Sequence, residues 1–175
     1  MKILAPISNV EHVRDYIRAG ADEFYIGFHD AAWEAAFGDY ADLNRMSGFK
    51  ERANPCTFEQ VLRIVDEVRG QGKDIFVTLN AALYSEQQLQ FLQRYLENLQ
   101  AHGVSGLIVS GFEIARLAQA AGIPVIASTM CGIYNADLAQ FYYDAGVQRM
   151  ILPRDLALDE IAGMTQQVPG MQTEV

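Results

Sequence analysis

The sequence predicts an α/β fold of the (β/α) TIM-barrel type, with six β/α units of an eight-stranded barrel. Three observations predict it. Short apolar runs alternate with amphipathic segments of helical period. A small residue and a glycine precede nearly every run, as in the short links of parallel α/β units. Polar residues follow several strands, as a barrel site requires, whereas an open doubly wound sheet gathers its site in one crevice.

Each predicted strand is a short run of mostly apolar and β-branched residues. Such runs are typical of parallel sheets, because both faces of the sheet are covered. Glycines 20, 72, 103, 122 and 146 stand just before all but the first run, and glycine accepts the positive φ that ends a helix. In chain order the strands are 2–6 (KILAP), 22–27 (DEFYIG), 74–79 (DIFVTL), 104–109 (VSGLIV), 123–128 (IPVIAS) and 148–152 (QRMIL).

Each predicted helix carries apolar residues at helical spacing, which gives it one stripe to lay on the sheet. Four helix starts have the spacing of a capping box, in which a hydroxyl side chain and an acidic or amide side chain bond each other's backbone amides. These pairs are Ser8 with Glu11, Thr57 with Gln60, Ser85 with Gln88, and Ser110 with Glu113. In chain order the helices are 9–19, 57–70, 86–101, 112–120, 136–145 and 158–167.

The barrel is favoured over an open sheet because "LAPISNV", after the first strand, lacks the G-x-G of a dinucleotide fingerprint. A complete barrel has eight strands and about 250 residues. Here the sequence stops at "QTEV", where a seventh strand could begin. We therefore interpret residues 1–175 as the N-terminal part of one barrel domain; the alternative is a smaller, complete domain with an open sheet. Unpaired strand edges would favour a homo-oligomer.

Composition narrows the function classes. The chain is 50% hydrophobic and carries a formal net charge of −9, so nucleic acid is not expected as a partner of this segment alone. It has no apolar run that could span a membrane, and we expect no secretory signal. Two cysteines are too few for a disulfide framework, which favours a cytoplasmic location. We expect a small-molecule or peptide ligand, with no cofactor and no metal in this segment.

Polar residues at the strand ends are the predicted ligand-binding residues. Asn80 follows the third strand, and its amide faces the barrel interior if Thr78 shares its side; the alternative is an amide that bonds the backbone of its own loop. The guanidinium of Arg154, after the sixth strand, suits a carboxylate or phosphate. The remaining candidates are hydroxyl residues that close the fourth and fifth strands, namely Ser110, Ser128 and Thr129; Ser110 is also predicted to cap a helix.

No complete catalytic set is visible in the sequence. His29 follows the second strand, and a pair with Cys131 would resemble a protease nucleophile and its base, although a solvated histidine and a buried inert cysteine are the alternatives. Asp155 could act as a base, hold Arg154, or cap the last helix. Cys56 precedes a helix whose dipole would lower the thiol pKa.

The longest linker, residues 28–56, is rich in aromatic residues and is predicted to be lid-like. Its segment "AAWEAAF" is predicted to form a short helix over the barrel mouth; the alternative is a plug that covers exposed core. Arg45, Lys50 and Arg52 cluster in the same linker, with Glu51 among them. We interpret this cluster as a solvated loop.

Several stretches resemble the N-terminal barrel of peptidase family U32, the collagenase-like proteases. They are "ILAPISNVEHVRDYIRAGADEFYIG", "VTLNAAL", "VSGLIVSGFEIARLAQAAGIPVIASTM" and "AGVQRMILPRDLALDEI", in the family's order and spacing over nearly the whole chain. The chain departs from the family at two places. Met130 stands where a glutamine is common, and Pro153, Arg154 and Asp155 stand where Ser-Arg-Glu is common.

The resemblance implies a U32-type peptidase whose pocket, at the carboxyl ends of the strands, binds an anionic or peptide-like ligand. It also implies an alternative, because other family members resemble oxygen-independent hydroxylation factors for transfer RNA, ribosomal RNA or ubiquinone precursors. Those carry an iron–sulfur cluster on four cysteines beyond the seventh strand, which would lie past residue 175. A binding domain without turnover is the third interpretation.

Overall fold

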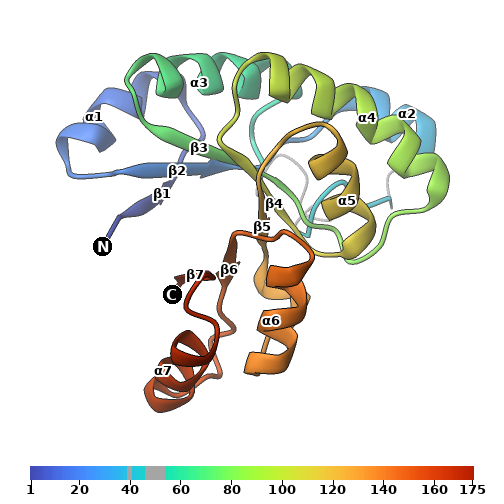
Figure 1. The fold of residues 1–175 in the computed structure, drawn as a ribbon. Helices are drawn as coiled ribbons and strands as arrows, with labels where there is room; N and C mark the ends of the chain where they lie inside the picture. Colours follow the sequence, from blue (N-terminus) through green and yellow to red (C-terminus); the bar gives the residue numbers. More distant parts are fainter. Residues whose placement is uncertain (39–40, 46–53) are drawn as a thin grey trace.

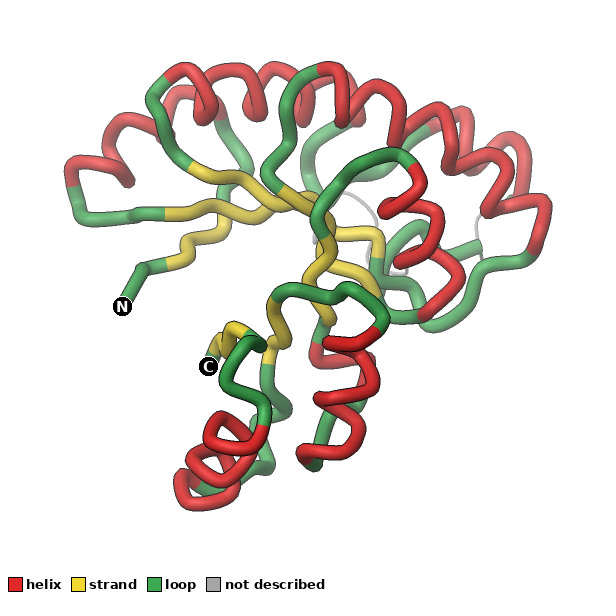
Figure 2. Tube along the Cα trace, in the orientation of Figure 1, coloured by secondary structure: helices red, strands yellow, loops and turns green. Residues whose placement is uncertain are grey.

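The computed structural model describes residues 1–38, 41–45 and 54–175. Within this part of the chain, seven parallel strands form one sheet in the order β1 to β7, each paired with its neighbours in sequence. The sheet curls, and the helices lie on its outer side (Figures 1 and 2). The strands are β1 (Leu4–Pro6), β2 (Glu23–Ile26), β3 (Asp74–Leu79), β4 (Gly106–Val109), β5 (Val125–Ala127), β6 (Arg149–Ile151) and β7 (Gln172–Glu174).

The helices alternate with the strands along the chain, which confirms the β/α pattern. The capping boxes at Thr57 and Ser85 both form as predicted. No helix among residues 1–38, 41–45 and 54–175 is both long and apolar enough to cross a membrane. The helices are α1 (Val13–Arg18), α2 (Ala31–Phe37), α3 (Phe58–Gly70), α4 (Glu86–Ala101), α5 (Phe112–Ala120), α6 (Ala136–Asp144) and α7 (Leu158–Gln167), with short 3-10 helices η1 (Val10–His12) and η3 (Thr129–Cys131).

The structure corrects three details of the predicted elements. The described sheet has seven strands rather than six units, because Gln172–Glu174, within the "QTEV" where a seventh strand could begin, pairs with β6. The predicted helix 9–19 is split into η1 and α1, since the side chain of Asn9, not Ser8, accepts the Glu11 amide and tightens the first turn. Ser110 caps no helix: the N-cap of α5 is Gly111, and the Ser110 hydroxyl donates to the Ala81 carbonyl.

Alternation along β3 divides the apolar residues between two layers. Ile75, Val77 and Leu79 point outward into the main core, where the helix stripes cover the sheet. Phe76 points inward and packs with Ile108 of β4 and Ile126 of β5. The inner cluster therefore fills the interior of the curl beneath the carboxyl ends of the strands.

An ion pair crosses this interior between strands that are not neighbours in the sheet. Glu23 begins β2 and its side chain is 3% exposed; its two carboxylate oxygens accept from Nη1 and Nη2 of Arg149 on β6, at 2.7 and 3.1 Å. Lys2 adds a contact of 2.6 Å from the solvent side. Burial acts to raise the pKa of Glu23, but hydrogen bonds from Arg149 and Lys2 outweigh it and hold this pKa below its usual value.

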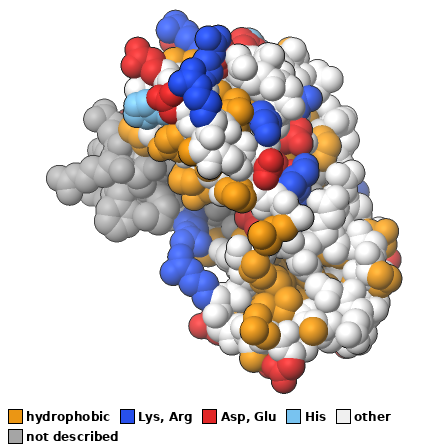
Figure 3. Space-filling view, turned by 90° about the vertical axis from the view of Figure 1, so that its left-hand side faces the viewer, with side chains coloured by type: hydrophobic (Ala, Val, Ile, Leu, Met, Phe, Trp, Pro, Cys, Tyr) orange, Lys and Arg blue, Asp and Glu red, His pale blue; other side chains and the backbone are white. Residues whose placement is uncertain are grey.

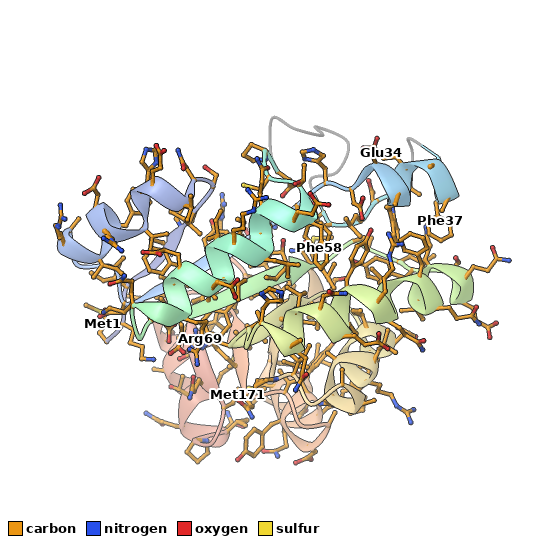
Figure 4. The ribbon with its side chains drawn as sticks, turned by 90° about the horizontal axis from the view of Figure 1, so that it is seen from above. Met1, Glu34, Phe37, Phe58, Arg69 and Met171 are labelled. Carbon is orange, nitrogen blue, oxygen red and sulfur yellow. The ribbon has the colours of Figure 1, made fainter. Side chains whose placement is uncertain are left out.

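The linker after β2 forms the predicted helix, α2, but this helix does not lie where the sequence placed it. Trp33 is buried and packs on Phe91 of α4 at 5.8 Å between ring centroids, and Phe37 packs on the same ring at 5.3 Å. Figure 4 shows α2 beside α4, with Phe37 at its end. The aromatic residues dock the linker onto the outer helix layer, because burying these rings against α4 removes their apolar surface from water.

Candidate functional site

A cavity of about 670 Å³ opens on the concave side of the sheet, toward the carboxyl ends of the strands. Its floor is apolar and includes Leu4, Ile108 and Ile151. Figure 3 shows hydrophobic side chains exposed in a band on the side of the molecule where the chain ends lie. The described residues that line the cavity include none from α2. The polar residues of its walls are Ser8, Asn44, Arg45, Asn54, Thr78, Asn80, Ser128, Thr129 and Glu174, together with Tyr16 and Tyr25.

Asn80 lies at this cavity and shares its inward side with Thr78, as alternation along the third strand predicts. Its amide group is engaged on both sides. Oδ1 accepts from the backbone amide of Arg45 at 3.1 Å, and Nδ2 donates to Oγ of Ser128 at 3.3 Å. Asn80 therefore joins β3, the end of β5 and the linker.

Ser128 and Thr129 also line the cavity, and both are fixed by hydrogen bonds. Ser128 is buried; its Oγ accepts from the Met130 amide at 3.3 Å as the cap of η3. Thr129 Oγ1 accepts from Nη1 of Arg45 at 3.0 Å. Each hydroxyl keeps its own O–H for a ligand or for water.

Two asparagines of the linker form a buried amide pair at the cavity wall. Asn44 and Asn54 are 2% and 7% exposed, and Nδ2 of Asn54 donates to Oδ1 of Asn44 at 2.9 Å. Asn44 in turn donates to the Phe28 carbonyl at 3.1 Å. Asn54 sits directly over Gly27, where a Cβ atom would fall 2.1 Å from its Oδ1. The two ends of the linker are thus pinned together above β2.

Sequence reasoning missed these linker residues. Arg45 belonged to a basic cluster that was interpreted as a solvated loop, and Asn54 precedes a proline, which signals only a turn. The other members of the cluster, Lys50 and Arg52, lie outside the described residues. Glu174 of β7 was missed as well; burial raises its pKa, although Nη1 of Arg149 lies 3.6 Å from its carboxylate.

Tyr84 anchors the linker to the end of β3, and its removal gives a testable result. The buried hydroxyl donates to the Leu43 carbonyl at 2.7 Å and accepts from the Ala81 amide at 3.1 Å. We expect Tyr84→Phe to lower the free energy of unfolding by about 1–3 kcal/mol, since it removes the acceptor of a buried amide. Urea denaturation measures this loss. Tyr143 is the control, because its side chain is exposed. If Tyr143→Phe lowered the free energy of unfolding by as much as Tyr84→Phe, the two hydrogen bonds of the Tyr84 hydroxyl would not be what stabilises the linker.

Five of the predicted site residues do not line the cavity, namely His29, Ser110, Cys131, Arg154 and Asp155. Ser110 bonds the Ala81 carbonyl. Arg154 and Asp155 are exposed, and the nearest described partner of Asp155 is the hydroxyl of Tyr134 at 3.5 Å. Asp155 does not cap the last helix either, because the N-cap of α7 is Ala157, whose amide donates to Glu160.

The structure does not bring the candidate protease groups together. Nδ1 of His29 lies 2.7 Å from the Asn54 carbonyl, so it carries the proton and donates. The Cys131 thiol donates to the Val109 carbonyl at 3.3 Å, and burial raises its pKa. Burial also raises the pKa of Cys56, which corrects the expectation that the helix dipole lowers it. A thiol held as a donor with a raised pKa is a poor nucleophile.

The described residues do not supply a metal site. No three His, Cys, Asp or Glu side chains among them are grouped closely enough to hold an ion. Cys56 lies in the linker and Cys131 in η3, and both are free thiols that donate hydrogen bonds to the carbonyls of Ser8 and Val109. This donor set does not fit an iron–sulfur cluster, which needs four thiolates.

Comparison with known proteins places this fold and sequence among relatives of two kinds. A sequence model of peptidase family U32 matches residues 8–175. The chain is 31% identical over 170 residues to the 23S rRNA 5-hydroxycytidine C2501 synthase of Escherichia coli (strain K12), covering 95% of this chain and 22% of the relative. It is 26% identical over 160 residues to a collagenase of Porphyromonas gingivalis, covering 91% of the chain and 34% of the relative.

The chain is also similar to a third relative and to a solved structure. The chain is 24% identical over 177 residues to the tRNA hydroxylation protein P of Helicobacter pylori, covering all of this chain and 38% of that protein. The chain thus spans well under half the length of these curated relatives. The structure of a U32 peptidase superposes with a TM-score of 0.72 at 15% identity, covering 99% of this chain and 68% of the other. That likeness supports a barrel-type fold.

Proposed function

Because the chain belongs to peptidase family U32, we propose that it is the substrate-binding part of a protein that hydroxylates a nucleoside in RNA. The observation that carries this proposal is the lining of the cavity. Amide, hydroxyl and guanidinium groups surround an apolar floor, an arrangement that orients a flat polar ligand such as a nucleobase. Relatives named for RNA hydroxylation align along nearly the whole chain, which supports the same substrate class.

In this proposal the described residues bind and orient the nucleoside. Replacing a C–H bond of a base by C–OH adds an oxygen atom and removes two electrons from the base, so the reaction needs both a source of oxygen, such as water, and an electron acceptor. The two cysteines of this chain do not fit an iron–sulfur cluster, and no chemical step is assigned to them. The floor would hold the base, while Asn80, Ser128 and Thr129 order the rim around it.

Peptide cleavage is the second candidate function, favoured by one observation: the similarity to a collagenase over 91% of the chain. Hydrolysis by a cysteine needs a thiolate next to a base. Cys131 instead donates to a carbonyl, its pKa is raised, and His29 donates to a different loop. These contacts argue against cysteine-based hydrolysis by the described residues.

Complementation tests the proposal. The full protein that carries this chain would be produced in Escherichia coli lacking either its 23S rRNA 5-hydroxycytidine C2501 synthase or its tRNA hydroxylation protein P. Digested ribosomal and transfer RNA would then be examined by mass spectrometry. We expect a hydroxylated nucleoside to return in one of the two strains, and Cys131→Ser to restore it to within about twofold, because serine keeps a donor for the Val109 carbonyl.

Two results would overturn the proposal that this chain serves RNA hydroxylation. RNA that stays unmodified in both strains, together with cleavage of gelatin that is lost in Cys131→Ser, would overturn RNA hydroxylation in favour of a cysteine peptidase. Gelatin cleavage that survives Cys131→Ser would also reject RNA hydroxylation if the RNA stays unmodified, and it would point to a different nucleophile.

A further inference from the structure

Arg45 is the basic side chain at the cavity that lacks a carboxylate partner in the described chain. Its side chain is exposed, and its guanidinium bonds only the hydroxyl of Thr129 there, through Nη1. Most other basic side chains pair with carboxylates, as expected in a chain of net charge −9. The paired residues are Lys2, Arg14, Arg18, Arg69, Lys73, Arg94 and Arg149. The remaining N–H groups of Arg45 are therefore open to an anion.

We propose that Arg45 binds a backbone phosphate of the RNA substrate at the mouth of the cavity, an inference that rests on the function proposed above. A guanidinium presents a planar fork of donors that matches two oxygens of a phosphate. Enzymes that act on a base take it out of its stack into a pocket, while the phosphates stay outside. The apolar floor of this cavity would hold the base of a nucleotide, and the guanidinium at its mouth would hold the phosphate.

The surroundings of Arg45 fix it at two points. Asn80 Oδ1 accepts from its backbone amide at 3.1 Å, and Thr129 Oγ1 accepts from its guanidinium at 3.0 Å. One residue before it, the buried Asn44 accepts a hydrogen bond from Asn54 of the same linker, and Asn54 sits over Gly27 just after β2. Asn80 is thus a positioning residue, acting through Arg45, rather than a direct contact of the ligand.

A phosphate fits this position better than the carboxylate of a peptide. Glu174 lines the same cavity, and its Oε2 accepts no hydrogen bond from the described residues. A carboxylate at the cavity disfavours a second carboxylate inside it, whereas a nucleotide places a neutral base there and keeps its phosphate outside, at Arg45.

The salt dependence of RNA binding tests this inference in the full protein. Binding of a fluorescent single-stranded oligoribonucleotide would be titrated at several salt concentrations. Losing one phosphate contact reduces the slope of log affinity against log salt by about 0.7 for a single strand. We expect Arg45→Ala to reduce the slope by that amount and affinity by about tenfold, whereas Arg45→Lys keeps the slope because it keeps the charge.

Arg63→Ala is the matched control, because it removes the same charge from an exposed position of α3. It should leave the slope unchanged. If Asn80 acts through Arg45, adding Asn80→Ala to Arg45→Ala should lower affinity little further; losses that multiply would make Asn80 a direct contact and reject the positioning role. Melting temperatures of all variants check that each remains folded.

The outcomes separate this inference from the function on which it rests. Wild-type binding with an unchanged slope in Arg45→Ala would overturn the role of Arg45 and leave RNA modification standing. No binding of RNA by the folded wild-type protein would overturn both. A slope that falls equally in Arg63→Ala would also overturn the role of Arg45, because the effect would then be one of net charge alone.

Discussion

Arg149→Met should lower the free energy of unfolding by about 3 kcal/mol, because it leaves the carboxylate of Glu23 in the interior without its main partner. Arg149 gives Glu23 two hydrogen bonds, and the side chains are 14% and 3% exposed. Losses of about 3–5 kcal/mol are typical when one member of a buried pair is removed. The low end applies here because Lys2 still contacts Glu23. Chemical denaturation measures the change.

Two variants control for the loss of charge and of packing. Lys2→Met removes the exposed partner, 59% exposed, and should cost less than about 1 kcal/mol. The double variant Glu23→Met with Arg149→Met should recover most of the loss, since no buried charge is then left unpaired. A single Arg149→Met variant no less stable than Lys2→Met would show that the interior pair does not hold β2 to β6.

The same pair predicts a pH dependence with a definite sign. The folded pKa of Glu23 lies below its unfolded value, so its contribution is present in full above the unfolded pKa, about 4.3. That contribution is lost as the pH falls through the folded pKa. Between neutral pH and about pH 3, wild-type stability should therefore fall more than that of the Glu23→Met, Arg149→Met variant. Denaturation midpoints of both proteins across this pH range measure the difference. If the two stabilities fell in parallel with pH, the ionised Glu23 would not contribute to stability as assigned.

Gly27→Ala should damage the site as well as the fold. A Cβ at Gly27 would lie 2.1 Å from Oδ1 of Asn54 and 2.8 Å from Oγ1 of Thr78. Asn54 cannot simply rotate away, because its Nδ2 is bonded to the buried Asn44. We expect a loss of about 1–3 kcal/mol in the free energy of unfolding, typical of overpacking. Because Asn44, the partner of Asn54, directly precedes Arg45 in the linker, RNA affinity should fall as well.

Gly163→Ala provides the matched control for this substitution. Nothing lies within 4 Å of a Cβ at Gly163, which is in the middle of α7. Alanine should raise stability there by about 0.5–1 kcal/mol, since glycine costs that much in a helix interior. Thermal unfolding and oligoribonucleotide titration on both variants give the comparison. Equal RNA affinity of Gly27→Ala and wild type would show that the Asn54 contact does not shape the cavity.

Local patterns in the sequence were sufficient for most of the elements. The predicted ranges coincide with the bounds of β3, α4, α5 and α7. The apolar periodicity of these elements acts within each segment itself. The capping boxes of α3 and α4 are likewise formed by residues three positions apart. The inward direction of Asn80 followed from alternation along the strand. The predictions were wrong where a competing partner lay elsewhere in the chain, as when the Ser110 hydroxyl bonds the Ala81 carbonyl instead of capping a helix.

The order of the amino acids was enough to establish the barrel-type alternation, the family, and three residues that line the cavity, namely Asn80, Ser128 and Thr129. The folded chain was needed to see that Arg45 and Asn54 reach the cavity, that Arg154 and Asp155 stay exposed, and that Glu23 meets Arg149 across the interior. The difference lies in the range of the interactions. Periodicity and caps link residues a few positions apart, whereas a linker has no period, and its side chains are placed by partners 35 to 84 residues away.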